Sequence, residues 1–217
     1  MRYGVLGTGM VGQAISARLA GLGHDVVMGS RDAGNAKANA WAAEQDHPVS
    51  VETFTDAAAH GELVVNATGG AVTLDVLAMA GAGNLDGKVL VDLSNPMDPG
   101  SGFPPTLLVA NTDSMGEQIQ RAYPGARVVK SLNTINCDVM VDPAIVPGEH
   151  VVFVAGEDAD AKATVTAMLA EFGWPAERIL DLGGIEAARA TEMYLQLWIR
   201  LNLVGGGHLF NIAVNRG

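Results

Sequence analysis

Short apolar runs alternate along the chain with stretches in which apolar residues recur at helical spacing. The runs predict buried strands at residues 3–6, 25–28, 49–51, 63–66, 88–93, 128–130, 150–155 and 178–180. The helical spacing predicts helices at 13–22, 35–45, 72–79, 115–122 and 160–172. Because strands and helices alternate, we expect an α/β fold with a doubly wound, mostly parallel sheet.

The pattern changes at Gly184. Residues 185–203 read as one long helix, the glycine triplet at 205–207 ends it, and residues 208–214 could add one or two helical turns. We therefore expect a sheet domain, residues 1–183, and a small helical C-terminal segment, residues 184–217. An apolar stripe around Trp198 predicts that this segment packs in the core or in the seam of a homodimer.

Composition narrows the possible functions. The chain has 217 residues, 48% of them hydrophobic, which is enough for a substantial core. A net charge of −11 argues against nucleic acid as a partner. A single cysteine excludes a disulfide framework and a paired-cysteine metal site. Since no apolar run reaches about 18 residues and the first residues do not resemble a signal peptide, we expect a soluble cytoplasmic protein without membrane partners.

The first strand ends in a glycine motif, Gly7-Thr8-Gly9-Met10-Val11-Gly12, that opens a helix. In the Rossmann fold such a G-x-G-x-x-G run binds a dinucleotide. Its glycines allow a tight turn, close approach of the backbone to a pyrophosphate, and packing of the helix on the sheet. The alternative is a glycine-rich turn that binds nothing.

The end of the second strand indicates which dinucleotide is bound. Ser30 lies 18 residues after Gly12, near the spacing of about 20 at which NAD enzymes place an acid on the ribose. Ser30 and Arg31 could instead hold the 2′-phosphate of NADP, and Asn35 or Lys37 could close the site. Alternatively, Ser30 is a helix N-cap and Arg31 a solvated charge. Asp32 weighs slightly against NADP.

Small and polar residues follow the later strands. They are Ala67, Thr68 and Gly69 after the fourth strand, Asn95 and Pro96 after the fifth, and Asn133 and Thr134 after the sixth. Ligands of such sheets bind beyond the carboxyl ends of the strands. The sequence therefore predicts that these loops line the cofactor cleft, although ordinary turns favour the same residue types.

No catalytic acid, base or metal site stands out. Cys137 has no histidine nearby in sequence and reads as a buried thiol, and the histidines lack metal-ligand spacing. Direct hydride transfer between a nicotinamide and a second planar acceptor needs little acid–base help, so it fits this sequence.

Over nearly its whole length the chain resembles the NADPH-dependent reductases of the deazaflavin coenzyme F420. The resemblance rests on GTGMVG at 7–12, GSR at 29–31, VVKSLNTI at 128–135 and LGGIEAARATE at 182–192. It implies that Ser30 and Arg31 hold the 2′-phosphate, and that Asn133 and Thr134 face the nicotinamide. The family often has a lysine where Asn35 stands, and a histidine where Asn133 stands.

The resemblance also implies an acceptor site. Gly183, Gly184, Ile185 and Arg189 would help to cover the deazaflavin, and Arg189 or Arg200 would meet its acidic tail. With the usual strand order, the Gly183 segment and the Asn133 loop should end near the same crevice. Other acceptors (a flavin, a quinone, a ferric chelate or a small imine) stay open, as does a non-catalytic NADP sensor.

Overall fold

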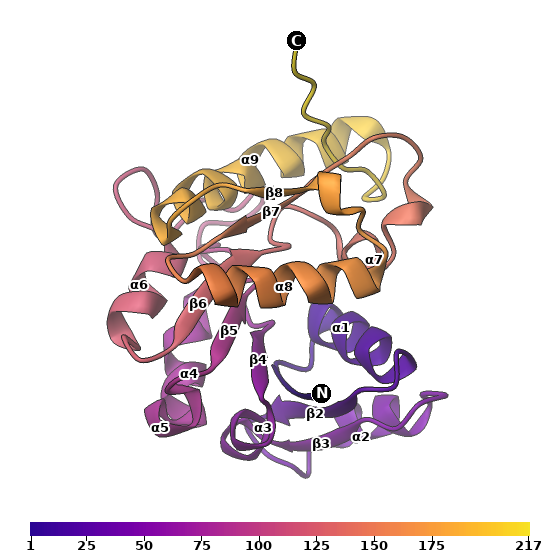
Figure 1. Ribbon diagram of the computed structural model, residues 1–217, viewed down its shortest axis with the longest axis vertical. Coiled ribbons are helices and arrows are strands. Elements are labelled where there is room, and N and C mark those ends of the chain that lie inside the picture. The colour runs from indigo at the N-terminus through magenta and orange to yellow at the C-terminus, as the bar shows by residue number, and fades with distance from the viewer.

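The computed structural model describes residues 1–217 and contains a sheet of eight strands with helices on both faces (Figure 1). The strands are β1 (Arg2–Leu6), β2 (Asp25–Ser30), β3 (Ser50–Thr53), β4 (Leu63–Asn66), β5 (Val89–Asp92), β6 (Arg127–Ser131), β7 (Val152–Ala155) and β8 (Ile179–Asp181). All eight overlap the strands expected from sequence, so the doubly wound α/β class is confirmed.

Nine α-helices connect or cover the strands. They are α1 (Met10–Gly21), α2 (Ala36–Ala43), α3 (Phe54–His60), α4 (Thr73–Ala80), α5 (Ala82–Leu85), α6 (Met115–Ala122), α7 (Cys137–Val141), α8 (Ala159–Phe172) and α9 (Ala188–Gly205). Four 3₁₀ turns add η1 (Gly70–Val72), η2 (Pro143–Ile145), η3 (Ala176–Arg178) and η4 (Ile185–Ala187). The sequence pattern did not predict α3, α5 and α7, which are short. No helix is long and apolar enough to cross a membrane.

The strand order is β3-β2-β1-β4-β5-β6-β7-β8. Strands β1 to β6 are parallel, whereas β7 runs antiparallel to β6 and β8 runs parallel to β7. Figure 1 shows β2 and β3 at the bottom of the sheet and β7 and β8 at the top. The carboxyl ends of β1 to β6 therefore share one edge, and those of β7 and β8 point to the opposite edge.

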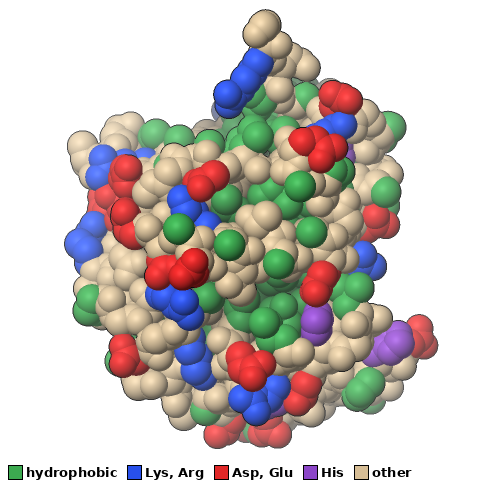
Figure 2. All heavy atoms as spheres, in the orientation of Figure 1, with side chains coloured by type: hydrophobic (Ala, Val, Ile, Leu, Met, Phe, Trp, Pro, Cys, Tyr) green, Lys and Arg blue, Asp and Glu red, His purple; other side chains and the backbone are tan.

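Because successive side chains of each strand point to opposite faces of the sheet, the hydrophobic core is divided into two clusters, one on each face. One cluster, which includes Val5 and Val65, lies under α1, α7 and α8. The other, which includes Leu6 and Val64, lies under α3, α4 and α6. On the outer surface drawn in Figure 2, Lys and Arg side chains are scattered among Asp and Glu rather than gathered into a patch.

The C-terminal segment packs as one helix and an irregular tail. Helix α9 lies against α6, where a Cβ on Gly116 would stand 3.0 Å from the Cβ of Ala188. The helix ends at Gly205, and residues 208–214 form no helix, which corrects the expectation of further turns. The tail is held instead by hydrogen bonds: Val151 N donates to Ile212 O (3.0 Å), and Asn211 Nδ2 donates to Val151 O (2.8 Å).

A glycine in the middle of β1 sets the distance between the sheet and α3. A Cβ on Gly4 would lie 2.1 Å from the carbonyl oxygen of Ala57, a backbone atom that cannot turn aside. We expect Gly4→Ala to lower the free energy of unfolding by about 1–3 kcal/mol, because α3 must move off the core. Thermal unfolding checks this.

Gly83→Ala is the matched control, because Gly83 lies in α5, has no positive φ, and has no atom within 4 Å of the place where a Cβ would stand. That substitution should be neutral or stabilising by up to about 1 kcal/mol. Equal melting temperatures for the two variants would contradict the steric argument.

Candidate functional site

The glycine motif forms the turn between β1 and α1 at the shared carboxyl edge. Gly7 has φ +118°, a conformation that L side chains rarely adopt, and its Cβ would meet Ala67 O at 2.8 Å. A Cβ on Gly12 would collide with Gly7 O at 2.0 Å. Gly9 has open space around it, with no atom within 4 Å of an added Cβ. Two glycines thus shape the turn, and the third leaves its backbone open to approach from outside.

The N-terminus of α1 is open. Its N-cap, Gly9, offers no side-chain cap, and the first turn holds no acidic residue. The first hydrogen bond into the helix runs from Gln13 N to Gly9 O (2.9 Å), and the backbone N–H groups of residues 8–12 have no acceptor in the protein. Unpaired N–H groups and the helix dipole together favour a bound anion such as a phosphate.

A groove of about 460 Å³ lies beside this turn at the end of β2. It contains four of the residues expected there, Thr8, Ser30, Arg31 and Asn35, together with Asp32 and with Thr68 from the loop after β4. Sequence reasoning missed the groove's apolar residues, because Phe54, Val72 and Val76 come from α3, η1 and α4. A phosphate and a flat apolar ring could both be held here.

Asn35 organises the polar end of the groove. Its Oδ1 caps α2 by accepting from Ala38 N (3.1 Å), and its Nδ2 donates to Ser30 Oγ (2.9 Å). Ser30 is therefore not an N-cap, and its own hydroxyl hydrogen is free for a ligand. The exposed guanidinium of Arg31 pairs with no side chain, while Asp32, which also lines the groove, accepts from Gly34 N through Oδ1 (2.8 Å).

The loops after β4, β5 and β6 meet at the same edge. Gly70 N donates to Asn95 O (3.1 Å), and a Cβ on Gly70 would stand 2.5 Å from that oxygen. Asn95 and Asn133 bond reciprocally: Asn95 Nδ2 donates to Asn133 O (2.7 Å), and Asn133 Nδ2 donates to Asn95 Oδ1 (3.0 Å). The structure thus brings Ala67, Thr68, Gly69, Asn95, Pro96, Asn133 and Thr134 together, as the strand pattern predicted.

A buried ion cluster under these loops was not predicted. Lys130 Nζ lies 2.8 Å from Asp92 Oδ2 and 2.8 Å from Glu192 Oε1, and all three side chains are almost fully buried. The ammonium also donates to the carbonyl of Ser94. Asp92 and Lys130 belong to neighbouring strands and Glu192 to α9, so only the fold brings them together.

The charges in this cluster are fixed by their partners. Burial alone would lower the pKa of Lys130, but the carboxylates of Asp92 and Glu192 outweigh it and raise that pKa above its ordinary value. Burial raises the pKa of Glu192. Yet Glu192 also accepts from Met115 N (2.8 Å) and Gly116 N (3.0 Å) at the start of α6. Its three hydrogen-bond partners, Lys130 Nζ, Met115 N and Gly116 N, are all donors, and these contacts favour the carboxylate form.

The expectation that the Gly183 segment ends beside the Asn133 loop is wrong. Lys130 of β6 pairs with Ala155 of β7, and Gly156 N donates to Gly183 O (3.0 Å), so Gly183 lies level with the middle of β6 rather than beyond its carboxyl end. The cause is the antiparallel β7, which carries β8 and Gly184 to the opposite edge. Ile185 is buried, and its Cδ1 would lie 3.2 Å from a Cβ on Gly116 of α6.

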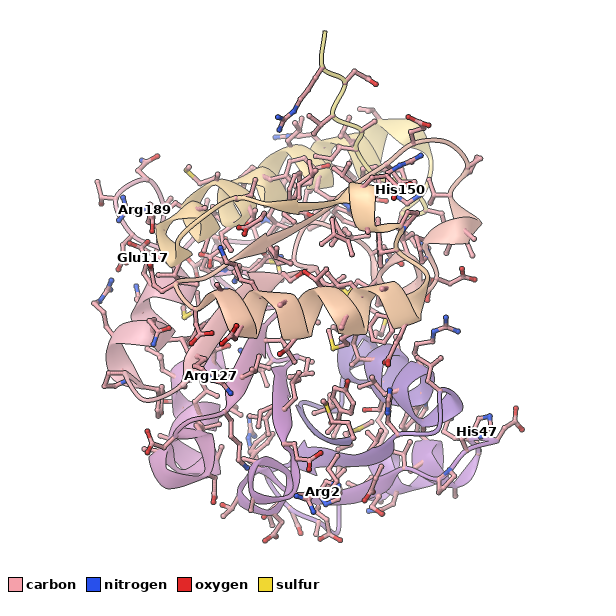
Figure 3. All side chains as sticks on the ribbon, in the orientation of Figure 1. Arg2, His47, Glu117, Arg127, His150 and Arg189 are labelled. Carbon is pink, nitrogen blue, oxygen red and sulfur yellow. The ribbon has the colours of Figure 1, made fainter.

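Arg189 is already paired. Its Nε donates to Glu117 Oε2 (2.8 Å) and its Nη2 to Glu117 Oε1, and Figure 3 shows the two side chains directed toward one another. The Arg189 hydrogen bonds lower the pKa of Glu117, and Glu117 raises that of Arg189. Arg200, the other expected cation, is exposed and has no partner.

Cys137 does not form a nucleophilic site. Its thiol is half-buried and lies 3.8 Å from Asp138 Oδ1. Burial first, and then the Asp138 carboxylate, raise the pKa of the thiol above its ordinary value. A raised pKa lowers the thiolate fraction, so Cys137 is a poor nucleophile.

Comparison with known proteins agrees with this geometry. The sequence model of the family described as "NADP oxidoreductase coenzyme F420-dependent" matches residues 2–96. The F420-dependent NADP reductase of Methanothermobacter marburgensis is 30% identical over 94% of this chain and 93% of its own. A crystal structure from Arthrobacter sp. FB24, provisionally named an F420-dependent NADP reductase, is 48% identical with a TM-score of 0.93 and covers 99% of both chains.

A second relative is much longer than this chain. The metalloreductase STEAP3 of Rattus norvegicus is 28% identical over 88% of this chain, but the chain spans only 36% of its length. The reductase of M. marburgensis, by contrast, aligns along almost its entire length, including the segment that carries Glu192. With the dinucleotide turn, the Ser30–Arg31 groove and this full-length match, the chain belongs to the family of F420-dependent NADP oxidoreductases.

Proposed function

We propose that the protein transfers a hydride between NADPH and the deazaflavin coenzyme F420. The observation that carries the cofactor half is the end of β2, where Ser30 and the unpaired Arg31 line a groove whose one acid, Asp32, already accepts a hydrogen bond from Gly34 N through Oδ1. The acceptor half rests on the relatives, which are named as F420-dependent NADP reductases. The unpaired N–H groups of residues 8–12 and the open space at Gly9 fit a dinucleotide pyrophosphate.

Each part of the cofactor has proposed residues. Ser30, Arg31 and Asn35 take the 2′-phosphate end, and residues 7–12 take the pyrophosphate. Thr68 borders the groove of Ser30 and Arg31 and faces the adenosine half, while Ala67, Gly69, Asn95, Pro96, Asn133 and Thr134 lie along the rest of the edge toward the nicotinamide. The dihydronicotinamide supplies the hydride and the solvent a proton. The protein supplies orientation and excludes water, so no catalytic acid or base is assigned.

We propose that residues 1–183 bind NADP and that α9, in the segment 184–217, borders the acceptor. Gln196 Nε2 donates to Pro105 O (2.7 Å) in the loop that follows Asn95 and Pro96. Arg200 lies one helical turn further along α9, and its charge is free. Because Arg189 is engaged with Glu117, Arg200 is the better candidate for the acidic tail of the acceptor.

The same segment supports a homodimer. Leu197, Leu203, Val204 and Leu209 are about half to four-fifths exposed on α9 and the tail. A two-fold contact between these segments would cover apolar surface that otherwise faces water. We place the enzyme in the cytoplasm, where NADPH is supplied.

The 2′-phosphate assignment predicts a cofactor preference. Arg31→Ala should remove a charge-assisted contact worth roughly 1.5–3 kcal/mol and weaken NADPH binding about tenfold to a hundredfold. NADH binding should hardly change, because NADH lacks the phosphate. Fluorescence titration with both cofactors checks this. Arg2→Ala is the control, because Arg2 lies at the amino end of β1, away from the groove. If Arg31→Ala weakens NADPH and NADH binding equally, the assignment of the 2′-phosphate site is wrong.

The acceptor prediction concerns Arg200. Arg200→Glu should raise the KM for a long-tailed deazaflavin about tenfold and spare a tailless analogue, because only the tail is anionic. Arg189→Gln should lower the melting temperature instead, since it breaks the contact with Glu117. If Arg189→Gln raises the KM and Arg200→Glu does not, the tail binds at Arg189.

The function itself is tested by mixing NADPH with a panel of acceptors and following nicotinamide absorbance. We expect oxidation with the deazaflavin. Rapid reduction of FMN, a quinone or a ferric chelate, with none of the deazaflavin, would leave the fold assignment standing and replace the acceptor. Binding of NADPH without turnover on any acceptor would make the protein a sensor.

The dimer prediction uses sedimentation at micromolar concentration. The wild-type chain should sediment as a dimer, and Val204→Asp should shift it toward the monomer because a charge would be buried in the contact. A wild-type monomer at that concentration would exclude the dimer.

A further inference from the structure

A continuous line of buried polar groups joins the C-terminal helix to the cofactor groove. It begins at Glu192 of α9, which pairs with Lys130, and Lys130 pairs with Asp92. Asp92 Oδ1 accepts from Asn66 Nδ2 (2.8 Å), and Asn66 Oδ1 accepts from the hydroxyl of Thr68 (2.6 Å). The first four members are buried, and the last lines the groove with Ser30 and Arg31.

Lys130 is not a proton donor to a substrate. Its ammonium has three hydrogens and three partners within the protein: Asp92 Oδ2, Glu192 Oε1 and the carbonyl of Ser94. The side chain is fully enclosed. Its role is therefore to hold its neighbours in place.

The direction of each hydrogen bond along this line follows from the charges. A carboxylate can only accept, so Asp92 forces Asn66 to turn its NH₂ group toward it. Asn66 Oδ1 must then face Thr68, where it also accepts from Thr68 N (3.3 Å). The hydroxyl hydrogen of Thr68 is thereby committed to Asn66. Thr73 Oγ1 lies 3.0 Å from Thr68 Oγ1 and also within 3.1 Å of Gly69 O, to which it donates, so at least one lone pair of Thr68 stays open.

We propose that Glu192 is a positioning residue for the cofactor, which acts through this line to present Thr68 Oγ1 to the groove as a hydrogen-bond acceptor. The inference rests on the proposed binding of NADPH and adds the chemistry of one contact. Thr68 accepts from a ribose hydroxyl or an amino group of the adenosine half, and it repels phosphate oxygens, which also only accept. The phosphate is thus directed to Ser30 and Arg31.

The test is a double-mutant cycle on the dissociation constant of NADPH. Thr68→Val and Glu192→Gln should each weaken binding about twofold to tenfold, the range for one hydrogen bond. In the double variant the dissociation constant should exceed that of either single variant by less than twofold, because each single substitution already breaks the line of hydrogen bonds. Independent effects would instead multiply, to within about a factor of two. Thr68→Ser should restore binding to the wild-type level.

Two further variants separate positioning from loss of structure. Glu117→Gln breaks the other side-chain contact between α6 and α9, the pair with Arg189. It should lower the melting temperature and leave NADPH binding unchanged. If Glu192→Gln does not fold, Lys130→Met/Glu192→Gln removes one charge of each sign and takes its place in the cycle.

Multiplicative effects in the cycle, or equal weakening by Glu117→Gln and Glu192→Gln, would overturn the inference. Failure of the wild-type protein to bind NADPH would overturn the proposed function instead, so the two outcomes are distinct.

Discussion

The structure depends on a lysine buried between two carboxylates. Removing charges from water costs several kcal/mol for each ion, so Lys130, Asp92 and Glu192 are tolerable only while all three hold their positions. Their backbones belong to β6, β5 and α9, and Glu192 also receives two N–H groups from α6. A shift in any of these four elements would leave a buried charge without its partner. The cluster therefore fixes the C-terminal helix relative to the loops at the carboxyl edge more stringently than apolar packing could.

The reversal of β7 divides the sheet into two parts with different tasks. Strands β1 to β6 end together beside the residues that we propose bind the cofactor, while β7 and β8 lead the chain to the opposite edge. Helix α9 then returns along α6 and brings Glu192, Gln196 and Arg200 back toward the crevice. The C-terminal segment thus reaches the carboxyl edge as a helix rather than as the loop after β8.

Local features could be predicted from the sequence. The glycine turn, the Ser30–Arg31 strand end and the residues that follow β4, β5 and β6 depend on neighbours in the chain. The position of Gly183 could not, because strand direction depends on which partner β7 finds across the sheet. Nor could the Lys130 cluster, since its members lie 38 and 62 residues apart and the sequence shows only isolated charges. The histidine expected at Asn133 is replaced by an amide, and the reciprocal bonds with Asn95 use that amide to join two loops.

Helix caps around the carboxyl edge have a further consequence. Asn35 caps α2, Thr53 caps α3, and Asn136 caps α7, while α6 has both Ser114 and Glu192 at its start. Helices α1 and α4 begin without a side-chain cap, and so does the 3₁₀ turn η1 that precedes α4. An anion that samples this edge finds most of the positive helix ends already neutralised by the protein's own oxygen atoms. The register of a long, multiply charged ligand is therefore set by the two helix ends, those of α1 and α4, to which the sequence supplies no side-chain oxygen.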